Sequence, residues 1–493
     1  MFKKLLRRTT LVLSLLILLQ PASVALADYR YDWWGNAMPS QYSYVAEDAY
    51  NGKELQVGDF NNPMDLFVDN NNLIYVLDSG NNRIVVFTED FNPVKIIDHF
   101  RSANGEENIT GAEGLFVNKD GKIYLADKAN QRVLVSDQEG NITRIITRPD
   151  SYLLDASVAF DPKKVLVDDR NIVYIISDKS SQGAYMIDEA GNFLGFYGRN
   201  KVMLTVKRLL DVTLRKFATK SQRDKMVNFI PVEFANFDID EKGFIYTVTA
   251  FSDDPFEDSM IKKLNPLGTN IIEDTGWYLW GDMPDFSTTE TTWLTNFCDV
   301  AVDENHFIYA LDKGKCNIYQ YEQEGGQLAI FGGNGSTLGR FLNPVAIETL
   351  HGKIFVLDNT KKNITVFEPT YFGEISIKAF SMFEDGYYLD SKSLFDEVVK
   401  MDQNFEYSLL GLGMAYYEGD NYKAAKKIFE RSNVANGKYS EVKKEIRNEW
   451  MKEHFAFIFF GIILAAFVFI IASKIISAKV HDMNKRSITK GDK

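Results

Sequence analysis

Five polar side chains stand at the start of five similar apolar segments, and their types suit the binding of a cation. Carboxylate and amide oxygens are the ligands that a hard cation such as Ca²⁺ prefers. The ammonium group of a lysine would instead compete with a metal ion for the same oxygens. The candidate binding residues are Asp65, Glu113, Lys164, Asn236 and Asp299, and a bound metal ion would take Asp65, Glu113, Asn236 and Asp299 as its ligands.

Other signatures of chemistry are missing from the sequence. The five histidines are scattered, and none stands at a zinc-ligand spacing. There is no phosphate-binding loop, nucleophile elbow or dinucleotide fingerprint. We therefore expect a protein that binds rather than catalyses, with no catalytic residue and with Ca²⁺ as the one cofactor that the residue types allow.

The segments that carry the five candidates belong to a repeat of about 51 residues. Six times, an apolar strand is followed by a polar turn and a second strand rich in apolar and aromatic residues. One such unit could not bury both faces of its sheet, whereas six units arranged radially could. The sequence therefore predicts a mainly β fold, a six-bladed β-propeller. The six strand pairs span residues 65–78, 114–127, 165–177, 237–249, 299–312 and 345–358.

Residues 51–372 resemble the NHL-repeat β-propellers, most clearly in Asn62–Phe87, Asp127–Val133 and Phe331–Phe341. The resemblance implies blades of four antiparallel strands around a central channel, with the five candidate residues at its mouth. Four repeats also keep an Asp followed five positions later by Arg or Asn, and we expect these pairs to close hairpins. The pairs are Asp78 with Arg83, Asp127 with Arg132, Asp312 with Asn317, and Asp358 with Asn363.

The same ring of candidates looks like the metal site of six-bladed lactonases of the gluconolactonase kind, in which the metal polarises the carbonyl group of a lactone. That resemblance implies an alternative function, a metal-dependent lactonase-like hydrolase with its site at the mouth of the channel. The presence of Lys164 and the lack of any histidine in the ring argue against this alternative.

Long insertions single out one face of the propeller. A helical pattern covers residues 201–228, an acidic segment covers 252–258, and a tryptophan-rich segment covers 277–293. In a propeller, connections of this kind emerge on the same face, and binding usually sits on such loops above a rigid scaffold. We expect this face to recognise a ligand or a protein, although the insertions could also serve to buttress blades 3 to 5.

Two apolar segments predict the compartment. Residues 1–27 have a basic start, an apolar core and a small-x-small end, the pattern of a signal peptide. Residues 455–476 are long and apolar enough for a transmembrane helix. Six Lys and Arg from Lys474 onward place the tail, residues 477–493, in the cytoplasm, and the body outside the cell membrane. Because the net charge is −13, nucleic acid is not expected as a partner.

Between the propeller, expected over residues 28–380, and the membrane span lies a helical segment, residues 386–453. Part of it is similar to one tetratricopeptide repeat, which could form a peptide-binding groove or a membrane-proximal spacer. Residues 440–453 are expected to run straight into the membrane span. Upstream of the first blade, residues 33–50 could supply the outer strand that closes the ring.

The layout as a whole resembles membrane-anchored NHL-repeat proteins of Gram-positive bacteria. That resemblance implies an accessory role beside solute or carbohydrate uptake, with a protein partner in the membrane or cell envelope. Cys298 and Cys316, the two cysteines of the chain, could form a disulfide outside the cell.

Overall fold

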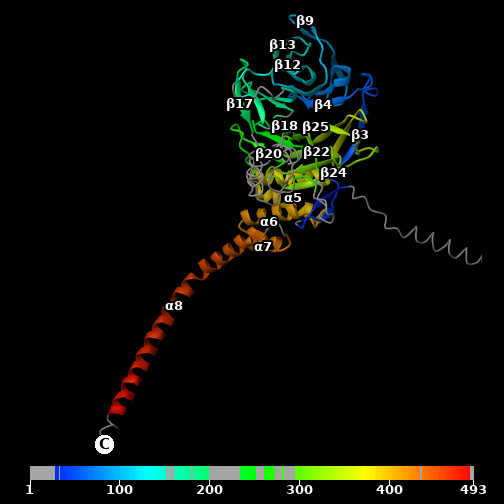
Figure 1. The fold of residues 1–493 in the computed structure, drawn as a ribbon. Helices are drawn as coiled ribbons and strands as arrows, with labels where there is room; N and C mark the ends of the chain where they lie inside the picture. Colours follow the sequence, from blue (N-terminus) through cyan, green and yellow to red (C-terminus); the bar gives the residue numbers. More distant parts are fainter. Residues whose placement is uncertain are drawn as a thin grey trace, which may run out of the picture.

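Six antiparallel sheets surround a central axis, with the first strand of each sheet innermost (Figure 1). The six-bladed β-propeller predicted from the repeats is confirmed. The protein is seen in a computed structural model, which describes residues 28–32, 34–151, 154, 160–178, 180, 182–198, 234–250, 260–272, 280–282, 295–432 and 436–488.

The first three strands of every blade follow the chain order from the axis outward. Blades 1 to 3 consist of β4 (Pro63–Val68), β5 (Ile74–Asp78), β6 (Arg83–Phe87) and β7 (Pro93–Ile97); β10 (Ala112–Val117), β11 (Ile123–Asp127), β12 (Arg132–Ser136) and β13 (Ile142–Ile146); and β14 (Pro162–Val167), β15 (Val173–Ser177), β16 (Ala184–Ile187) and β17 (Phe193–Tyr197). Blades 4 to 6 contain β18 (Phe234–Ile239), β19 (Ile245–Thr249) and β20 (Ile261–Leu264); β21 (Phe297–Val302), β22 (Ile308–Asp312), β23 (Asn317–Tyr321) and β24 (Gln327–Gly332); and β25 (Pro344–Leu350), β26 (Lys353–Asp358) and β27 (Asn363–Pro369).

Short elements complete the ring. The 3₁₀ turns η1 (Ser79–Asn81) and η2 (Lys128–Asn130) join the second and third strands of blades 1 and 2, and the hairpin of β8 (Phe100–Ser102) and β9 (Gly105–Glu107) links these two blades.

The segment upstream of blade 1 closes the ring, as its position in the sequence suggested. Strand β3 (Tyr44–Asn51) pairs antiparallel with β27 and is the fourth strand of blade 6. Strand β1 (Tyr29–Tyr31) adds to the outer edge of β24 in blade 5, and β2 (Ala37–Pro39) pairs with β1. The N-terminal strands therefore cover edges that would otherwise be open to pairing with other chains.

The aspartates of the Asp-to-Arg pairs are structural. In blade 1 the fully buried Asp78 accepts hydrogen bonds from Nε of Arg83 and from the backbone N–H of Asn61, both at 2.7 Å. In blade 2, Asp127 binds Nε of Arg132 at 2.8 Å. Each carboxylate thus holds both its own hairpin and the entry to its blade, which confirms the expected hairpin-closing role for these two pairs.

In blades 5 and 6 the equivalent aspartate also holds the chain segment that enters its blade. Asp312 and Asp358 accept backbone N–H groups from residues 296 and 342, at 2.8 and 2.6 Å. Asn317 faces Asp312 across the hairpin as its strand partner, but its amide donates to the hydroxyl of Tyr29 at 3.1 Å.

The chain then continues as helices α4 (Tyr371–Glu384), α5 (Tyr388–Met401), α6 (Glu406–Glu418), α7 (Tyr422–Phe429) and α8 (Asn436–Ile488). Small residues bring neighbouring helices together: a Cβ atom on Gly411 would lie 2.5 Å from the ring of Phe395, and one on Gly413 would lie 2.1 Å from the ring of Phe429. The helical segment predicted before the membrane span is therefore a set of packed pairs.

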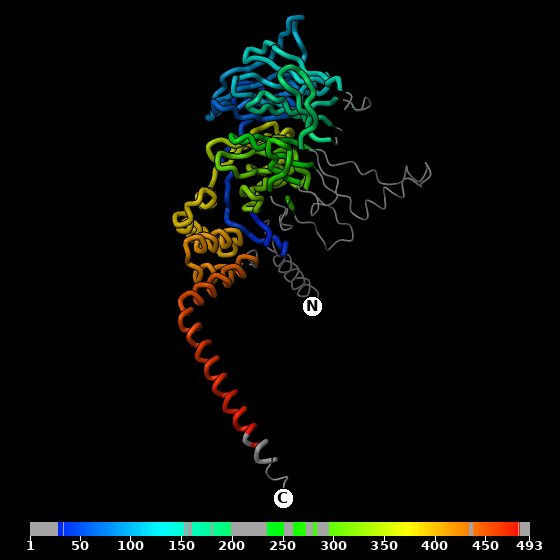
Figure 2. Tube along the Cα trace, turned by 90° about the vertical axis from the view of Figure 1, so that its left-hand side faces the viewer, coloured from blue at the N-terminus to red at the C-terminus, as the bar shows by residue number. Residues whose placement is uncertain are grey.

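These helices are attached to one face of the propeller. Strand β27 ends beside the start of β26 and the end of β25, so α4 leaves from the face that carries the turns between first and second strands. We call this the turn face, and we call the opposite face, which carries η1 and η2, the hairpin face. Phe372 and Phe380 of α4 share a core with Phe307 of blade 5. Figure 2 shows the helices beside the lower part of the propeller.

The N-terminal strand also binds the helices. Arg30 of β1 forms a buried ion pair with Asp402, which follows α5, and its guanidinium lies 4.2 Å from the ring centre of Phe405. Propeller, N-terminal strand and helices are thus joined by both apolar packing and a buried ion pair.

Helix α8 is continuous from the helical segment into the predicted membrane span, as expected for residues 440–453. Its first part packs on α7 through Val442, and the candidate span lies within Gly437–His481, where none of the most apolar stretch is buried. The chain therefore has one described helix that is long and apolar enough to cross a membrane.

Cys298 and Cys316 are free thiols, so the disulfide considered from the sequence is not formed. Cys298 lies in β21 and Cys316 directly precedes β23, and β22 stands between these two strands. The expected signal peptide, residues 1–27, and the helical insertion, residues 201–228, lie outside the described residues, as do residues 252–258 and most of 277–293.

Replacing Asp78 by Ala is expected to lower the free energy of unfolding by about 3 kcal/mol, because it leaves Nε of the half-buried Arg83 and a backbone N–H without their acceptor. Thermal or denaturant unfolding of the detergent-solubilised chain measures this change. Asp120→Ala, at an exposed turn, is the control and should stay within about 0.5 kcal/mol. Equal stabilities of the two variants would contradict the structural role of Asp78.

Candidate functional site

The inner strands bring one residue from each blade to the axis at the same register. The third residue of each inner strand faces the next-to-last residue of the second strand, for example Asp65 opposite Leu77. The six equivalent positions are Asp65, Gly114, Lys164, Asn236, Asp299 and Ala346. Four of the five residues predicted from the sequence are therefore brought together, and we call Asp65, Lys164, Asn236 and Asp299 the axial ring.

Glu113 is not part of this ring. Each inner strand has a bulge before its third residue, so Glu113 occupies the bulged position beside Gly114. Its carboxylate binds Nζ of Lys128 at 2.9 Å, and Lys128 in turn pairs with Asp178 of blade 3. The repeat aligns Gly114 with Asp65, because their strand pairs start at 114 and 65, so the prediction of Glu113 followed its acidic type and not its repeat position.

Gly114 allows the inner strands of blades 2 and 3 to approach each other closely at the axis. A Cβ atom there would lie 2.5 Å from the carbonyl oxygen of Lys163 and 2.8 Å from Cα of Lys164. Only glycine lets the inner strands of blades 2 and 3 approach this closely, and the approach positions the Lys164 side chain.

The axial ring is held together by its own side chains. Nζ of Lys164 lies 2.5 Å from Oδ1 of Asp65, and the amide of Asn236 donates to Oδ1 of Asp299. All four side chains belong to residues that are at most 6% exposed. Burial alone would lower the pKa of Lys164, but the carboxylates of Asp65 and Asp299 outweigh it, and the pKa is raised. The lysine is therefore a charged ammonium group.

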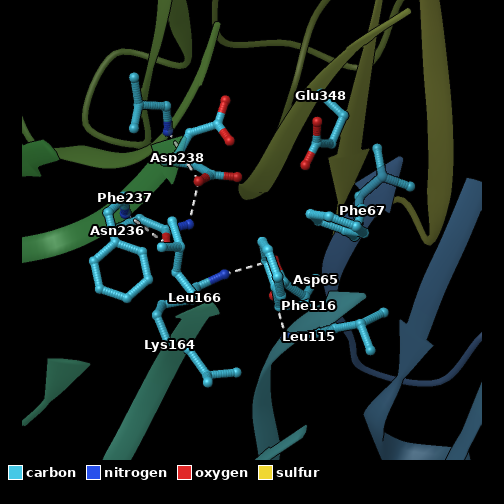
Figure 3. A pocket seen from close by; sticks show the side chains of 14 residues that line it. Asp65, Phe67, Leu115, Phe116, Lys164, Leu166, Asn236, Phe237, Asp238 and Glu348 are labelled. Carbon is cyan, nitrogen blue, oxygen red and sulfur yellow. Dashed lines mark hydrogen bonds and ion pairs between the residues drawn. The ribbon is translucent and has the colours of Figure 1, made fainter. Parts of the chain in front are cut away.

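A second set of side chains lies two residues further along the same strands and faces the axis nearer the turn face. Blades 1 to 3 contribute Phe67, Phe116 and Leu166, whereas blades 4 and 6 contribute Asp238 and Glu348. We call these five residues the turn-side layer. In Figure 3, Asp238 and Glu348 lie above the ion pair of Lys164 and Asp65. The layer thus has an apolar half and an acidic half.

The acidic half was not predicted from the sequence. Asp238 and Glu348 belong to the apolar segments that carry the repeat, where they interrupt the apolar pattern two residues beyond Asn236 and Ala346. Because side chains two apart share a face of a strand, the spacing could have revealed both carboxylates as neighbours of the ring.

Burial and the repulsion between like charges raise the pKa values of these acids. Burial raises the pKa of Asp238 to about 7. Burial also raises the pKa of Asp299 to about 7, although Lys164 opposes this change. The pKa of Glu348 is raised well above its usual range by burial and by the carboxylates of Asp238, Asp299 and Asp65. Lys164 is the one base among the residues that line this cavity, and it is bound to Asp65.

Three of the acids also bind the neighbouring blade. Asp65 accepts the backbone N–H of Leu115 at 2.7 Å, Asp238 accepts that of Val302 at 2.8 Å, and Asp299 accepts that of Ile347 at 2.8 Å. Inner strands have unpaired N–H groups on their axial edge, so these bonds satisfy donors that would otherwise be buried without a partner. For Glu348, the corresponding donor is the N–H of its own neighbour, Thr349.

The two layers enclose a small cavity on the axis of the propeller. Its volume of about 20 Å³ is enough for about one water molecule. Leu115, Val165, Phe237 and Val300 complete its wall. The site can therefore receive a small group or the end of a side chain rather than a large substrate.

The comparison with known proteins agrees with the fold. Residues 60–87, which contain β4, β5 and β6 of blade 1, match the family model of the NHL repeat. The chain contains an NHL repeat. No curated protein matches the sequence.

Solved structures similar to this NHL propeller share little sequence with it. Virginiamycin B lyase from Staphylococcus aureus is 10% identical, with 66% of this chain and 99% of that chain covered and a TM-score of 0.40. A gluconolactonase from Xanthomonas campestris is 9% identical, with 63% and 86% covered and a TM-score of 0.38. A protein of unknown function from Bacteroides thetaiotaomicron is 13% identical, with 63% and 70% covered and a TM-score of 0.40. Similarity at this level carries no argument about activity.

The side chains of this NHL propeller do not fit the Ca²⁺ ion that the lactonase resemblance implies. The carboxylate of Glu113 forms an ion pair with Lys128, and the ammonium group of Lys164 forms one with the carboxylate of Asp65. Among the described residues, no three His, Cys, Asp or Glu side chains are grouped to hold a metal ion. We therefore derive no reaction through a metal at this site.

Glu348→Gln is expected to stabilise the protein near pH 8, by about 1–2 kcal/mol. Above its usual pKa of 4.5, the unfolded chain carries an ionised Glu348, while the folded protein resists that ionisation. The wild type therefore loses stability as the pH rises, and the uncharged amide does not. Unfolding of both proteins near pH 4 and pH 8 measures the difference, which should disappear at the lower pH.

Glu189→Gln, at an exposed turn between β16 and β17, provides the matched control and should leave the stability unchanged at both pH values. A Glu348→Gln protein that is no more stable than the wild type near pH 8 would show that Glu348 is not subject to repulsion at the axis.

Proposed function

We propose that this chain is a membrane-anchored binding protein whose propeller recognises a positively charged group at its axis, without catalysing a reaction. The observation that carries the proposal is the acidic half of the turn-side layer. Asp238 and Glu348 line a cavity whose one base, Lys164, is already bound to Asp65.

The surroundings of these carboxylates suit an ammonium or guanidinium group. A cation between Asp238 and Glu348 would relieve the repulsion that raises the pKa of Glu348. Phe67 and Phe116, whose ring centres are 4.9 Å apart, line the same cavity from blades 1 and 2. Aromatic rings attract cations through their faces, and this attraction is strongest where water is excluded.

The face opposite the helices offers a second surface for recognition. The helices that lead to the candidate span leave from the turn face, so a partner could meet the hairpin face separately from a cation bound at the turn-side layer. The basic residues after the span favour a cytoplasmic tail. On this proposal the propeller lies outside the cell, where it could bind a partner in the envelope, including one that takes up solutes or carbohydrates.

Binding at the axis can be measured as a shift of the melting temperature. Spermidine and an oligo-arginine peptide should raise the melting temperature of the detergent-solubilised chain by a few degrees, whereas an oligo-glutamate peptide should not. Combining Asp238→Asn with Glu348→Gln should abolish the shift, and Glu189→Gln should preserve it. Equal shifts in the double variant and the wild type would exclude the axis as the binding site.

A partner on the hairpin face can be captured by photocrosslinking in intact cells. A photoreactive amino acid in place of the exposed Lys313, at the hairpin between β22 and β23, should give a defined crosslinked partner. The same amino acid in place of Leu267, which is 89% exposed at the opposite face, is the control. Identical products from both positions would contradict recognition by the hairpin face.

The orientation can be tested separately with a green fluorescent protein fused to the C-terminus, since this protein does not fluoresce after export through the general secretion pathway. Strong fluorescence is expected. A dark fusion that is expressed and inserted would place the tail outside and contradict the proposed topology.

A further inference from the structure

We propose that Lys164 takes the place of a metal ion at the propeller axis, and that removal of its ammonium group turns the axial ring into a binding site for a divalent cation. This inference is independent of the proposed function, because it concerns the ring near the hairpin face and does not require a ligand at Asp238 and Glu348.

The first step is the position of the ammonium group. Nζ of Lys164 lies 2.5 Å from Oδ1 of Asp65, and Asp299 is the second carboxylate whose charge acts on it. These acids come from blades 1 and 5, on either side of the small Ala346 of blade 6. A single positive charge therefore stands between carboxylates from separate blades, which is the task that a metal ion would perform.

The second step is the chemistry of the groups around Nζ. Asp65 and Asp299 offer carboxylate oxygens, which are the ligands of a hard cation. The amide oxygen of the neighbouring Asn236 accepts the backbone N–H of Phe237 at 2.8 Å. In the wild type the Asn236 amide donates to Asp299, and Lys164 binds Asp65. Without the lysine, the two carboxylates would face each other in a buried place with no compensating charge, and a divalent ion with its waters could fill the space of the removed side chain.

The third step is the contrast with the neighbouring lysine. Lys163 occupies the bulged position before Lys164, and its Nζ lies 4.0 Å from Oδ1 of Asp178 on the hairpin side. Its side chain is 31% exposed, against 7% for Lys164. Two adjacent residues of the same type thus have different tasks, which makes Lys163 a matched control.

The test compares thermal unfolding of the full-length, detergent-solubilised protein in millimolar Ca²⁺ and in EDTA. Wild type and Lys163→Ala should melt at the same temperature in both. Lys164→Ala should melt lower in EDTA, and Ca²⁺ should raise its melting temperature by about 3–5 °C. Adding Asp299→Asn to Lys164→Ala should remove most of the Ca²⁺ effect, because it removes a ligand.

Lys164→Met keeps most of the volume of the side chain and provides a second variant if Lys164→Ala does not fold. Isothermal titration of Ca²⁺ into either folded variant gives a direct binding curve. Saturable Ca²⁺ binding by a Lys164 variant, absent from the wild type and Lys163→Ala, supports the inference. It is overturned if neither Lys164 variant binds Ca²⁺, or if the wild type is stabilised by Ca²⁺ to the same extent.

Discussion

Six strands meet at the axis of this propeller with one edge unpaired, and much of the structure depends on how their backbone N–H groups find acceptors. Aspartates from three blades supply those acceptors to the next blade. This use of aspartates as acceptors places several carboxylates within one small buried space, where they repel one another. Lys164 reduces that repulsion, and Gly114 makes the space in which the lysine lies. The charges at the axis are therefore first a condition for closing the ring.

The same account separates structural from functional acids. Asp65, Asp238 and Asp299 each have a backbone partner in the next blade, so each contributes to the fold even without a ligand. The carboxylate of Glu348 instead binds a donor of its own strand. Among these four acids, Glu348 is therefore the one that holds no neighbouring blade, and the proposed binding of a cation would give its charge a partner.

The repeat, the membrane helix and the closing strand could be predicted because each depends on a local pattern of apolar residues. Repeated apolar segments, each followed by a polar turn, predicted the inner strands, and an uninterrupted apolar run predicted the span within α8. The ring was predicted for four residues and missed at Glu113, because the prediction took the acidic residue next to Gly114, which is the residue that the repeat aligns with Asp65. The turn-side layer was missed because its members are mostly apolar, although Asp238 and Glu348 stand two residues beyond ring positions, a spacing that places them beside the ring.

The continuous helix α8 has a geometric consequence. Ile446 is the last of its residues to pack against the helices above, and Phe455 begins the apolar stretch, so about 13 Å of unsupported helix separates the two. A rigid rod of this length sets both the height of the propeller above the lipid and its angle about the rod. Adding one residue would turn the propeller by about 100°, so a neighbour in the bilayer that engages one particular rim would meet a different blade, although every blade would be intact.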